Sequence, residues 1–178
     1  MKHRIYNKSM YQFDSPEDSL WEATPGNRSA KSHKLLGDQI SDIAIIGGGY
    51  TGLSTAYHLA KKYNITSSVI DAGHIGWGAS GRNGGFCSMG GTAESIKALI
   101  KKYGLEDVKK YYQCQIEAIE LVRKIIIDED IDINIQGKAE IEVARSSRDH
   151  EVLASYARLR QDVLGLKTNI ISRDDFAE

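Results

Sequence analysis

The feature of this sequence that most limits its fold is a glycine turn between an apolar run and a helix-forming stretch. Gly47, Gly49 and Gly52 have the spacing Gly-x-Gly-x-x-Gly, directly after the apolar run 43–46. Asp71 follows nineteen residues after the third glycine, at the end of a second apolar run. The dinucleotide-binding fingerprint consists of a strand, a glycine turn, a helix, a second strand and an acidic residue, in this order. The motif therefore predicts a Rossmann-like βαβ unit of the α/β class.

Each part of the fingerprint has a physical role. The three glycines permit, in order, a tight turn, close approach of the backbone to a pyrophosphate, and close packing of the helix on the sheet. The first helical amides, around Tyr50 and Thr51, would face the phosphates from the positive end of the helix dipole. Asp71 can accept hydrogen bonds from both hydroxyls of an adenosine ribose. A free 2′-hydroxyl is expected, because a 2′-phosphate would meet a like charge.

A second glycine-rich segment, residues 72–85, follows the acid. So many glycines exclude a helix or a packed strand and predict a loop. Ser80, Arg82 and Asn83 supply hydrogen-bond donors, and Arg82 adds a fixed positive charge. Such a loop can wrap the rest of a pyrophosphate and approach a flat ring through its amides. A merely flexible surface loop is the alternative, but the aromatic residues within and beside the segment are unusual for one.

The stretches IAIIGGGYTGLSTAYHLA and GWGASGRNGG resemble the FAD-dependent amino-acid/amine oxidase superfamily, which includes D-amino acid oxidase and glycine oxidase-like proteins. The likeness is closest to the gamma-glutamylputrescine oxidase-like branch. The segment SLWEAT at 19–24 also resembles the leader of that branch. The resemblance implies FAD as the cofactor and names no catalytic residue. The residues expected to bind FAD are Gly47, Gly49, Tyr50, Thr51, Gly52, Asp71, Ala72, Gly78, Ser80, Arg82, Asn83 and Gly84.

The resemblance also implies a reaction. It predicts an oxidoreductase that acts on the CH–NH2 group of a small-molecule amine or amino acid, with hydride transfer to flavin and oxygen as acceptor. Two alternatives stay open: a fragment of an NAD-linked dehydrogenase, and an inactive truncated product that binds nucleotide. The second glycine segment argues against NAD, because NAD folds usually need no second phosphate loop. For the 178-residue chain by itself we expect no turnover.

The chain is expected to contain three segments. Residues 1–38 are a polar leader, 39–130 an FAD-binding region with a helical extension, and 131–178 the start of an α+β substrate domain. Members of the superfamily are longer, so the chain resembles an amino-terminal fragment without the C-terminal half of the oxidase fold. Apolar faces of 106–127 and 131–143 would then lack partners, which predicts marginal stability.

The periodicity of apolar residues predicts helices and strands along the whole chain. Serine, threonine and acidic residues indicate helix starts, and glycines indicate stops. The expected elements are a strand at 43–46, a helix at 50–62, a strand at 68–70, a helix from Thr92 or Glu94 to Gly104, a helix at 106–127, strands at 131–135 and 139–143, a helix from 146 to 164, a strand at 168–171 and a helix from 172.

Composition excludes several classes of protein. The contents of 41% hydrophobic and 26% charged residues are typical of a globular protein. The net charge of −1 provides no electrostatic footprint for nucleic acid. Cys87 and Cys114 have neither a CxxC nor a metal-ligand spacing, so we expect two buried thiols, a reducing compartment and no metal site. No secretory signal and no spanning apolar run is visible, which predicts a cytoplasmic protein.

Overall fold

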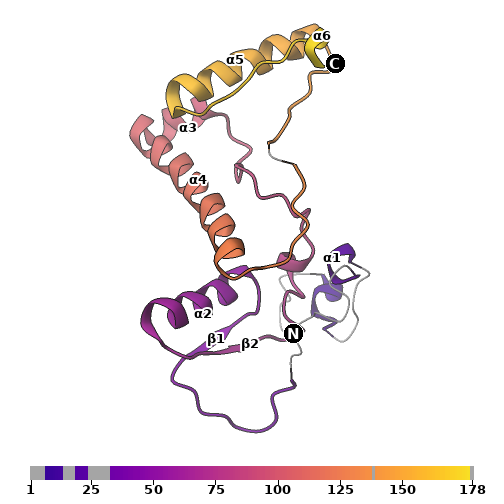
Figure 1. The fold of residues 1–178 in the computed structure, drawn as a ribbon, viewed down its shortest axis with the longest axis vertical. Coiled ribbons are helices and arrows are strands. Elements are labelled where there is room, and N and C mark those ends of the chain that lie inside the picture. Colours follow the sequence, from indigo (N-terminus) through magenta and orange to yellow (C-terminus); the bar gives the residue numbers. More distant parts are fainter. Residues whose placement is uncertain (1–6, 14–18, 24–32, 138, 177–178) are drawn as a thin grey trace. The chain divides into compact units, whose positions relative to one another are not determined.

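The computed structural model divides into two compact units, residues 1–86 and 87–178. The boundary expected near residue 130 stays a prediction. Figure 1 shows the elements in chain order. The residues described are 7–13, 19–23, 33–137 and 139–176. Part of the expected leader therefore lies outside the described residues.

The first unit contains the expected βαβ arrangement (Figure 1). Strands β1 (Ala44–Ile46) and β2 (Ser68–Ile70) are parallel, and helix α2 (Tyr50–Tyr63) connects them and packs against both. The paired residues are Ala44 with Ser68, Ile45 with Val69, and Ile46 with Ile70. The strand, helix and strand predicted at 43–46, 50–62 and 68–70 are thus confirmed.

The ends of α2 follow from local backbone chemistry. Gly47 has φ +106°, a conformation that side chains with a Cβ rarely adopt, so the turn out of β1 requires glycine. Gly49 caps the helix without a side-chain hydrogen bond. Asn64 ends it in the left-handed conformation, and its amide donates to the Ala60 carbonyl at 3.0 Å. The N-cap position of α2 therefore supplies no side-chain acceptor for the first amides of the helix.

The described leader segments contact the glycine-rich loop in this unit. They contain a 3-10 helix, η1 (Lys8–Tyr11), and the short helix α1 (Leu20–Ala23). The loop itself contains a 3-10 turn, η3 (Ala79–Gly81). The rings of Phe13 and Trp77 lie 4.8 Å apart, centroid to centroid. Phe13 of the leader thus packs on an aromatic residue of the loop.

The second unit is helical: α3 (Ile96–Tyr103), α4 (Leu105–Asp128), α5 (Ser147–Leu164) and α6 (Arg173–Phe176). Ser95 caps α3, since its Oγ accepts from the Ala98 amide at 3.2 Å, so this helix begins later than the threonine that we expected. The other predicted starts and stops agree with the structure to within one or two residues.

The core of the second unit lies where α3 meets the first turns of α4. Ile96, Leu99, Val108 and Tyr112 are buried there, and Ile96 is fully excluded from solvent. Apolar side chains of α5 pack against this cluster, including Tyr156. The amphipathic pattern of 106–127 therefore places its first two apolar residues in the core.

Burial and the neighbouring Tyr156 raise the pKa of the Tyr112 phenol above its ordinary value of 10.0. The unfolded chain then loses this proton more readily than the folded chain. The contribution of Tyr112 to stability is complete below pH 10 and falls as the pH rises through the folded-state pKa. We expect the free energy of unfolding to fall above pH 10, and Tyr112→Phe to remove that part of the fall. Urea unfolding followed by circular dichroism measures this free energy at each pH. The same pH dependence in the wild type and in Tyr112→Phe would contradict the role of Tyr112.

Three predicted strands are wrong. Residues 131–135, 139–143 and 168–171 form no strand in the structure. Alternation of apolar and polar residues describes a side-chain pattern, but a strand also needs a hydrogen-bonded neighbour, and these segments have none among the described residues. The Thr168 hydroxyl donates instead to the Ala157 carbonyl of α5, at 3.0 Å.

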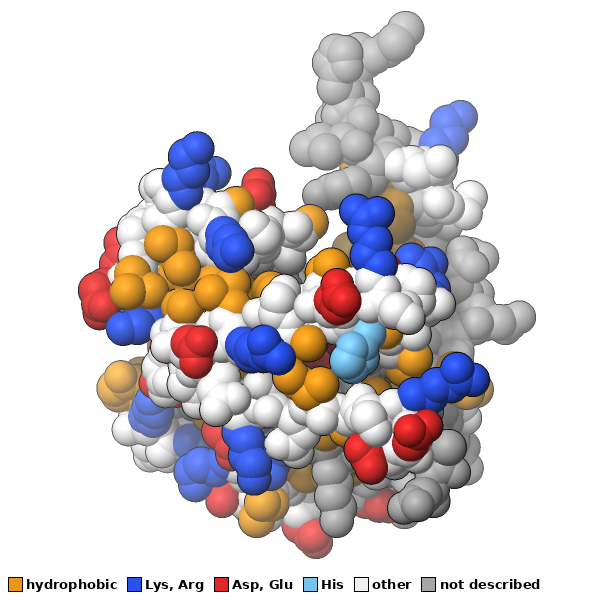
Figure 2. Space-filling view, turned by 90° about the horizontal axis from the view of Figure 1, so that it is seen from above, with side chains coloured by type: hydrophobic (Ala, Val, Ile, Leu, Met, Phe, Trp, Pro, Cys, Tyr) orange, Lys and Arg blue, Asp and Glu red, His pale blue; other side chains and the backbone are white. Residues whose placement is uncertain are grey.

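The prediction of buried thiols is also wrong, because Cys87 and Cys114 are both free and exposed. Figure 2 shows hydrophobic side chains that reach the surface in groups beside charged ones. Val122, Ile135 and Ile141 are among the exposed apolar residues. The apolar residues at 131–143 and part of the apolar face of 106–127 are therefore solvent-exposed here, whereas the first two residues of that helical face are buried. The marginal stability expected from them stays a prediction.

None of the helices among the described residues is both long enough and apolar enough to span a membrane.

Candidate dinucleotide site

A hollow of about 240 Å³ lies at the glycine turn of the first unit. Six residues expected to bind the cofactor line it: Gly47, Gly49, Tyr50, Thr51, Gly52 and Ser80. Ile45 and Ile46 of β1 add apolar wall, and Thr55 of α2 adds a hydroxyl. Thr55 is not among the predicted residues, although its position one helical turn after Thr51 could have indicated it.

Ser80 connects the glycine-rich loop to the start of α2. Its Oγ accepts a hydrogen bond from the Tyr50 amide at 3.0 Å. An added Cβ on Gly49 would lie 2.8 Å from the same Oγ. The loop can therefore approach the turn this closely only because Gly49 has no side chain. Two segments about thirty residues apart in sequence thus form one wall of the hollow.

Asp71 binds the backbone of the glycine turn through its carboxylate. Its Oδ2 accepts from the Gly48 amide at 2.6 Å, and its Oδ1 accepts from the Gly73 amide at 2.8 Å. Hydrogen bonds to an ionised carboxylate are among the stronger ones in proteins. A carboxylate has about four lone-pair positions, so each oxygen retains one position for a further donor. The acid of the fingerprint therefore connects the glycine turn to the segment after β2.

Gly52 is required by close packing. An added Cβ would collide with the carbonyl oxygen of Gly47 and lie 3.3 Å from the Ile45 side chain. Because the first of these neighbours is backbone, it cannot move aside by a change of rotamer. The third glycine of the fingerprint thus allows α2 to lie directly on the turn that it follows.

Arg82 has unused hydrogen-bonding capacity. Its guanidinium carbon lies 4.4 Å from the ring centroid of Trp77, which is buried at 5% exposure. The Nε and one terminal nitrogen of Arg82 are buried and have no hydrogen-bond partner among the described residues. Buried donors are nearly always paired in folded proteins, so this cationic group fits an anionic ligand such as a phosphate.

The remaining predicted residues, like Asp71 and Arg82, do not line the hollow. The Asn83 side chain donates to the Ser80 carbonyl at 2.9 Å and accepts from the Gly85 amide at 2.7 Å. The Gly78 carbonyl accepts from the Gly81 amide at 3.2 Å. Ala72 and Gly84 are exposed. Binding of a ligand by these four residues stays a prediction.

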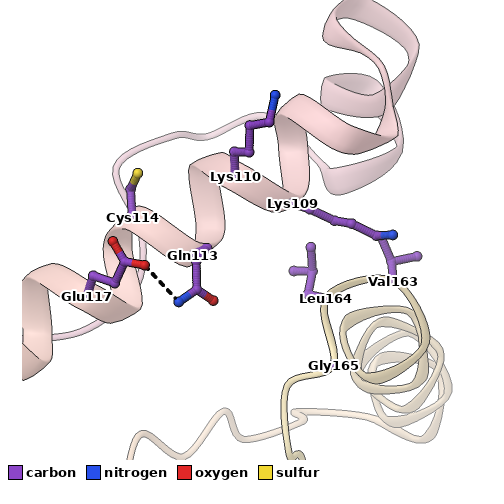
Figure 3. A pocket seen from close by; sticks show the side chains of 8 residues that line it. All are labelled: Lys109, Lys110, Gln113, Cys114, Glu117, Val163, Leu164 and Gly165. Atoms are coloured by element: carbon purple, nitrogen blue, oxygen red, sulfur yellow. Dashed lines mark hydrogen bonds between the residues drawn. The ribbon is translucent and has the colours of Figure 1, made fainter.

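A wider hollow of about 670 Å³ lies in the second unit, between α4 and the end of α5 (Figure 3). Lys109 extends from α4 toward Val163 and Leu164, and the Gln113 amide donates to Glu117 at 3.0 Å. Lys109 and Lys110 are each paired with an acidic side chain of their own helix. The smaller hollow is the better candidate site, because it brings together the three glycines of the fingerprint and Ser80.

Two parallel strands joined by a helix, with a glycine turn between the first strand and that helix, define the class of Rossmann-like dinucleotide-binding domains. Comparison with known sequences then gives the family. The profile of the FAD dependent oxidoreductase family (DAO) matches residues 42–178. The chain belongs to this family.

Several known proteins are similar to this chain. Gamma-glutamylputrescine oxidoreductase of Escherichia coli is 35% identical over 114 residues, which is 64% of this chain and 26% of the relative. The probable oxidoreductase OrdL of Rhizobium meliloti is 44% identical over 43% of this chain and 15% of its own length. Sarcosine oxidase subunit beta of the same species is 51% identical over 24% of this chain and 10% of its own length.

The chain thus spans about a quarter or less of the length of these relatives. No solved structure matches it.

Proposed function

We propose that this chain forms the FAD-binding part of an oxidoreductase that acts on the CH–NH2 group of an amine or amino acid, with oxygen as the acceptor. The observation that carries the proposal is the hollow at the glycine turn, with the unpaired donors of Arg82 in the adjoining loop. The membership of the chain in the FAD-dependent family supports the choice of cofactor.

The residues of the first unit have distinct roles in this proposal. The amides of the first turn of α2 that follow the Tyr50 amide bind the pyrophosphate, because they lie at the positive end of the helix dipole. The Tyr50 amide itself donates to Ser80. The remaining lone pairs of Asp71 accept from the ribose hydroxyls. Arg82 neutralises phosphate charge. When bound, FAD supplies the hydride-accepting chemistry, whereas these residues position it.

The names of the relatives support the proposed substrate class. Gamma-glutamylputrescine and sarcosine, which two of the names contain, are both amines. Substrate-binding and catalytic residues are not assigned in this chain, and turnover is proposed for a protein that carries the whole oxidase fold.

An absorption spectrum tests the proposed cofactor. The purified chain is incubated with FAD, desalted and measured, and a parallel sample is incubated with NAD. We expect retention of the two absorption bands of oxidised flavin at near-stoichiometric occupancy, and no retention of NAD. A protein that emerges colourless contradicts the proposal, and retention of NAD supports a dehydrogenase. Anaerobic addition of candidate amines to the longest available parent protein then tests for bleaching of the flavin.

Arg82→Gln tests the role of the loop cation. The amide removes the positive charge, so we expect the Kd for FAD to rise about ten-fold, equivalent to about 1.4 kcal/mol. The rise should be smaller at high salt, since screening weakens the lost attraction. Arg123→Gln is a matched control, because Arg123 is exposed on α4 and forms a surface pair with Glu120 at 3.8 Å. Equal Kd values for Arg82→Gln and the control would contradict the assignment.

A further inference from the structure

We propose that Ser19 and Trp21 of the leader are positioning residues of the cofactor site. They hold the backbone on both sides of Arg82, so that the glycine-rich loop is ordered before FAD arrives. This inference rests on the proposed function, since it concerns the same site.

Two hydrogen bonds carry the inference. The Trp21 indole Nε1 donates to the Asn83 carbonyl at 2.6 Å, and the Ser19 hydroxyl donates to the Gly81 carbonyl at 3.0 Å. Each bond joins residues that are 62 positions apart in the sequence. The two carbonyls belong to the residues immediately before and after Arg82. The leader therefore fixes the peptide unit directly before Arg82 and the peptide unit that follows Asn83.

Two apolar contacts strengthen the arrangement. An added Cβ on Gly85 would lie 2.8 Å from the Trp21 ring, so the indole lies against the loop where glycine leaves room. Phe13 contacts Trp77 at 4.8 Å between ring centroids, and Trp77 is the aromatic residue on which Arg82 stacks. Both the residues that flank Arg82 and its stacking partner are thus in contact with the leader.

The energetic reason is the glycine content of the loop. Glycine loses more conformational entropy than other residues when it is ordered, so a loop of this kind is costly to fix upon binding. Contacts made before binding remove part of that cost from the binding step. Loss of the leader contacts should therefore weaken FAD binding although neither leader side chain lines the hollow.

Conservative substitutions test each bond in the full chain. Trp21→Phe retains an aromatic ring and removes the N–H donor. Ser19→Ala removes the hydroxyl, and Ser19→Thr restores one. We expect the Kd for FAD to rise about five-fold in Trp21→Phe and Ser19→Ala, as for the loss of one net hydrogen bond. Ser19→Thr should bind nearly as the wild type does, and the exposed Ser88→Ala provides the control.

Hydrogen exchange without FAD provides the second readout. The amides of Gly81, Arg82 and Gly85 are hydrogen-bonded within the loop, to Gly78, Ala79 and Asn83. We expect these amides to exchange faster in Trp21→Phe and Ser19→Ala than in the wild type and Ser19→Thr. Faster exchange with an unchanged Kd overturns the inference, and so does unchanged exchange. A wild type that does not bind FAD contradicts the proposed function, while the exchange comparison still decides whether the leader orders the loop.

Discussion

Gly52→Ala is expected to prevent the βαβ unit from folding as described and to abolish FAD binding. The new methyl group would overlap the Gly47 carbonyl oxygen, and it would press on Ile45 at 3.3 Å. The turn at Gly47 is already held at φ +106°, so relief requires movement of α2 away from both strands. Overpacking of this kind costs about 3 kcal/mol or more when backbone must move. A sheet of two three-residue strands has little stability with which to offset that cost.

Hydrogen exchange of the sheet measures the effect of Gly52→Ala. The Gly47 amide donates to the Ile70 carbonyl at 2.7 Å, and the Ser68 amide donates to the Ile43 carbonyl at 2.9 Å. Both amides should lose their protection in Gly52→Ala. Gly90→Ala is the control, because an added Cβ at Gly90 meets no atom within 4 Å. Retained protection and FAD binding in Gly52→Ala would show that α2 does not pack on the turn in this way.

Asp71→Asn is expected to weaken FAD binding about 100-fold. The carboxylate accepts from two backbone amides, at 2.6 Å from Gly48 and 2.8 Å from Gly73. An asparagine side chain has one oxygen, so its NH2 group would face one of these N–H donors. The substitution removes a charge-assisted hydrogen bond and leaves one backbone amide without an acceptor. Together these two effects cost about 3 kcal/mol, which corresponds to the expected change in Kd.

Titration with FAD, followed by quenching of flavin fluorescence, measures this change. Asp42→Asn is a suitable control, because Asp42 is an exposed carboxylate just before β1. The control changes the net charge equally and leaves the turn intact. If both variants bind FAD like the wild type, Asp71 does not organise the cofactor site.

The sequence predicted the first unit well because its determinants are local. Few alternative folds are open to residues 43–71. They contain an apolar run, a turn that requires glycine, a helix of suitable length and a second apolar run, in this order. The starts of α4 and α5 were also predictable, since Gly104 and Ser146 occupy their caps. For the site, the fingerprint indicated five of the residues that line the hollow, and the second glycine-rich segment indicated a sixth, Ser80.

The remaining features depend on contacts between distant residues, which one sequence does not reveal. The alternation at 131–135 is compatible with a strand, but no described neighbour pairs with it, so it stays irregular. Cys114 follows Tyr112 by two positions, which places it away from the core on a helix, and it is exposed. Nothing local to Ser19 indicates that its hydroxyl reaches the Gly81 carbonyl.

The position of the two tryptophans also makes the units separable by spectroscopy. Trp21 lies on the glycine-rich loop and Trp77 lies within it, and the chain has no other tryptophan. Indole fluorescence therefore reports on the first unit alone. Most of the helical dichroism instead comes from α3, α4 and α5 in the second unit. Unfolding followed by both signals compares the two units in one unlabelled sample, and coincident transitions would show that they unfold together.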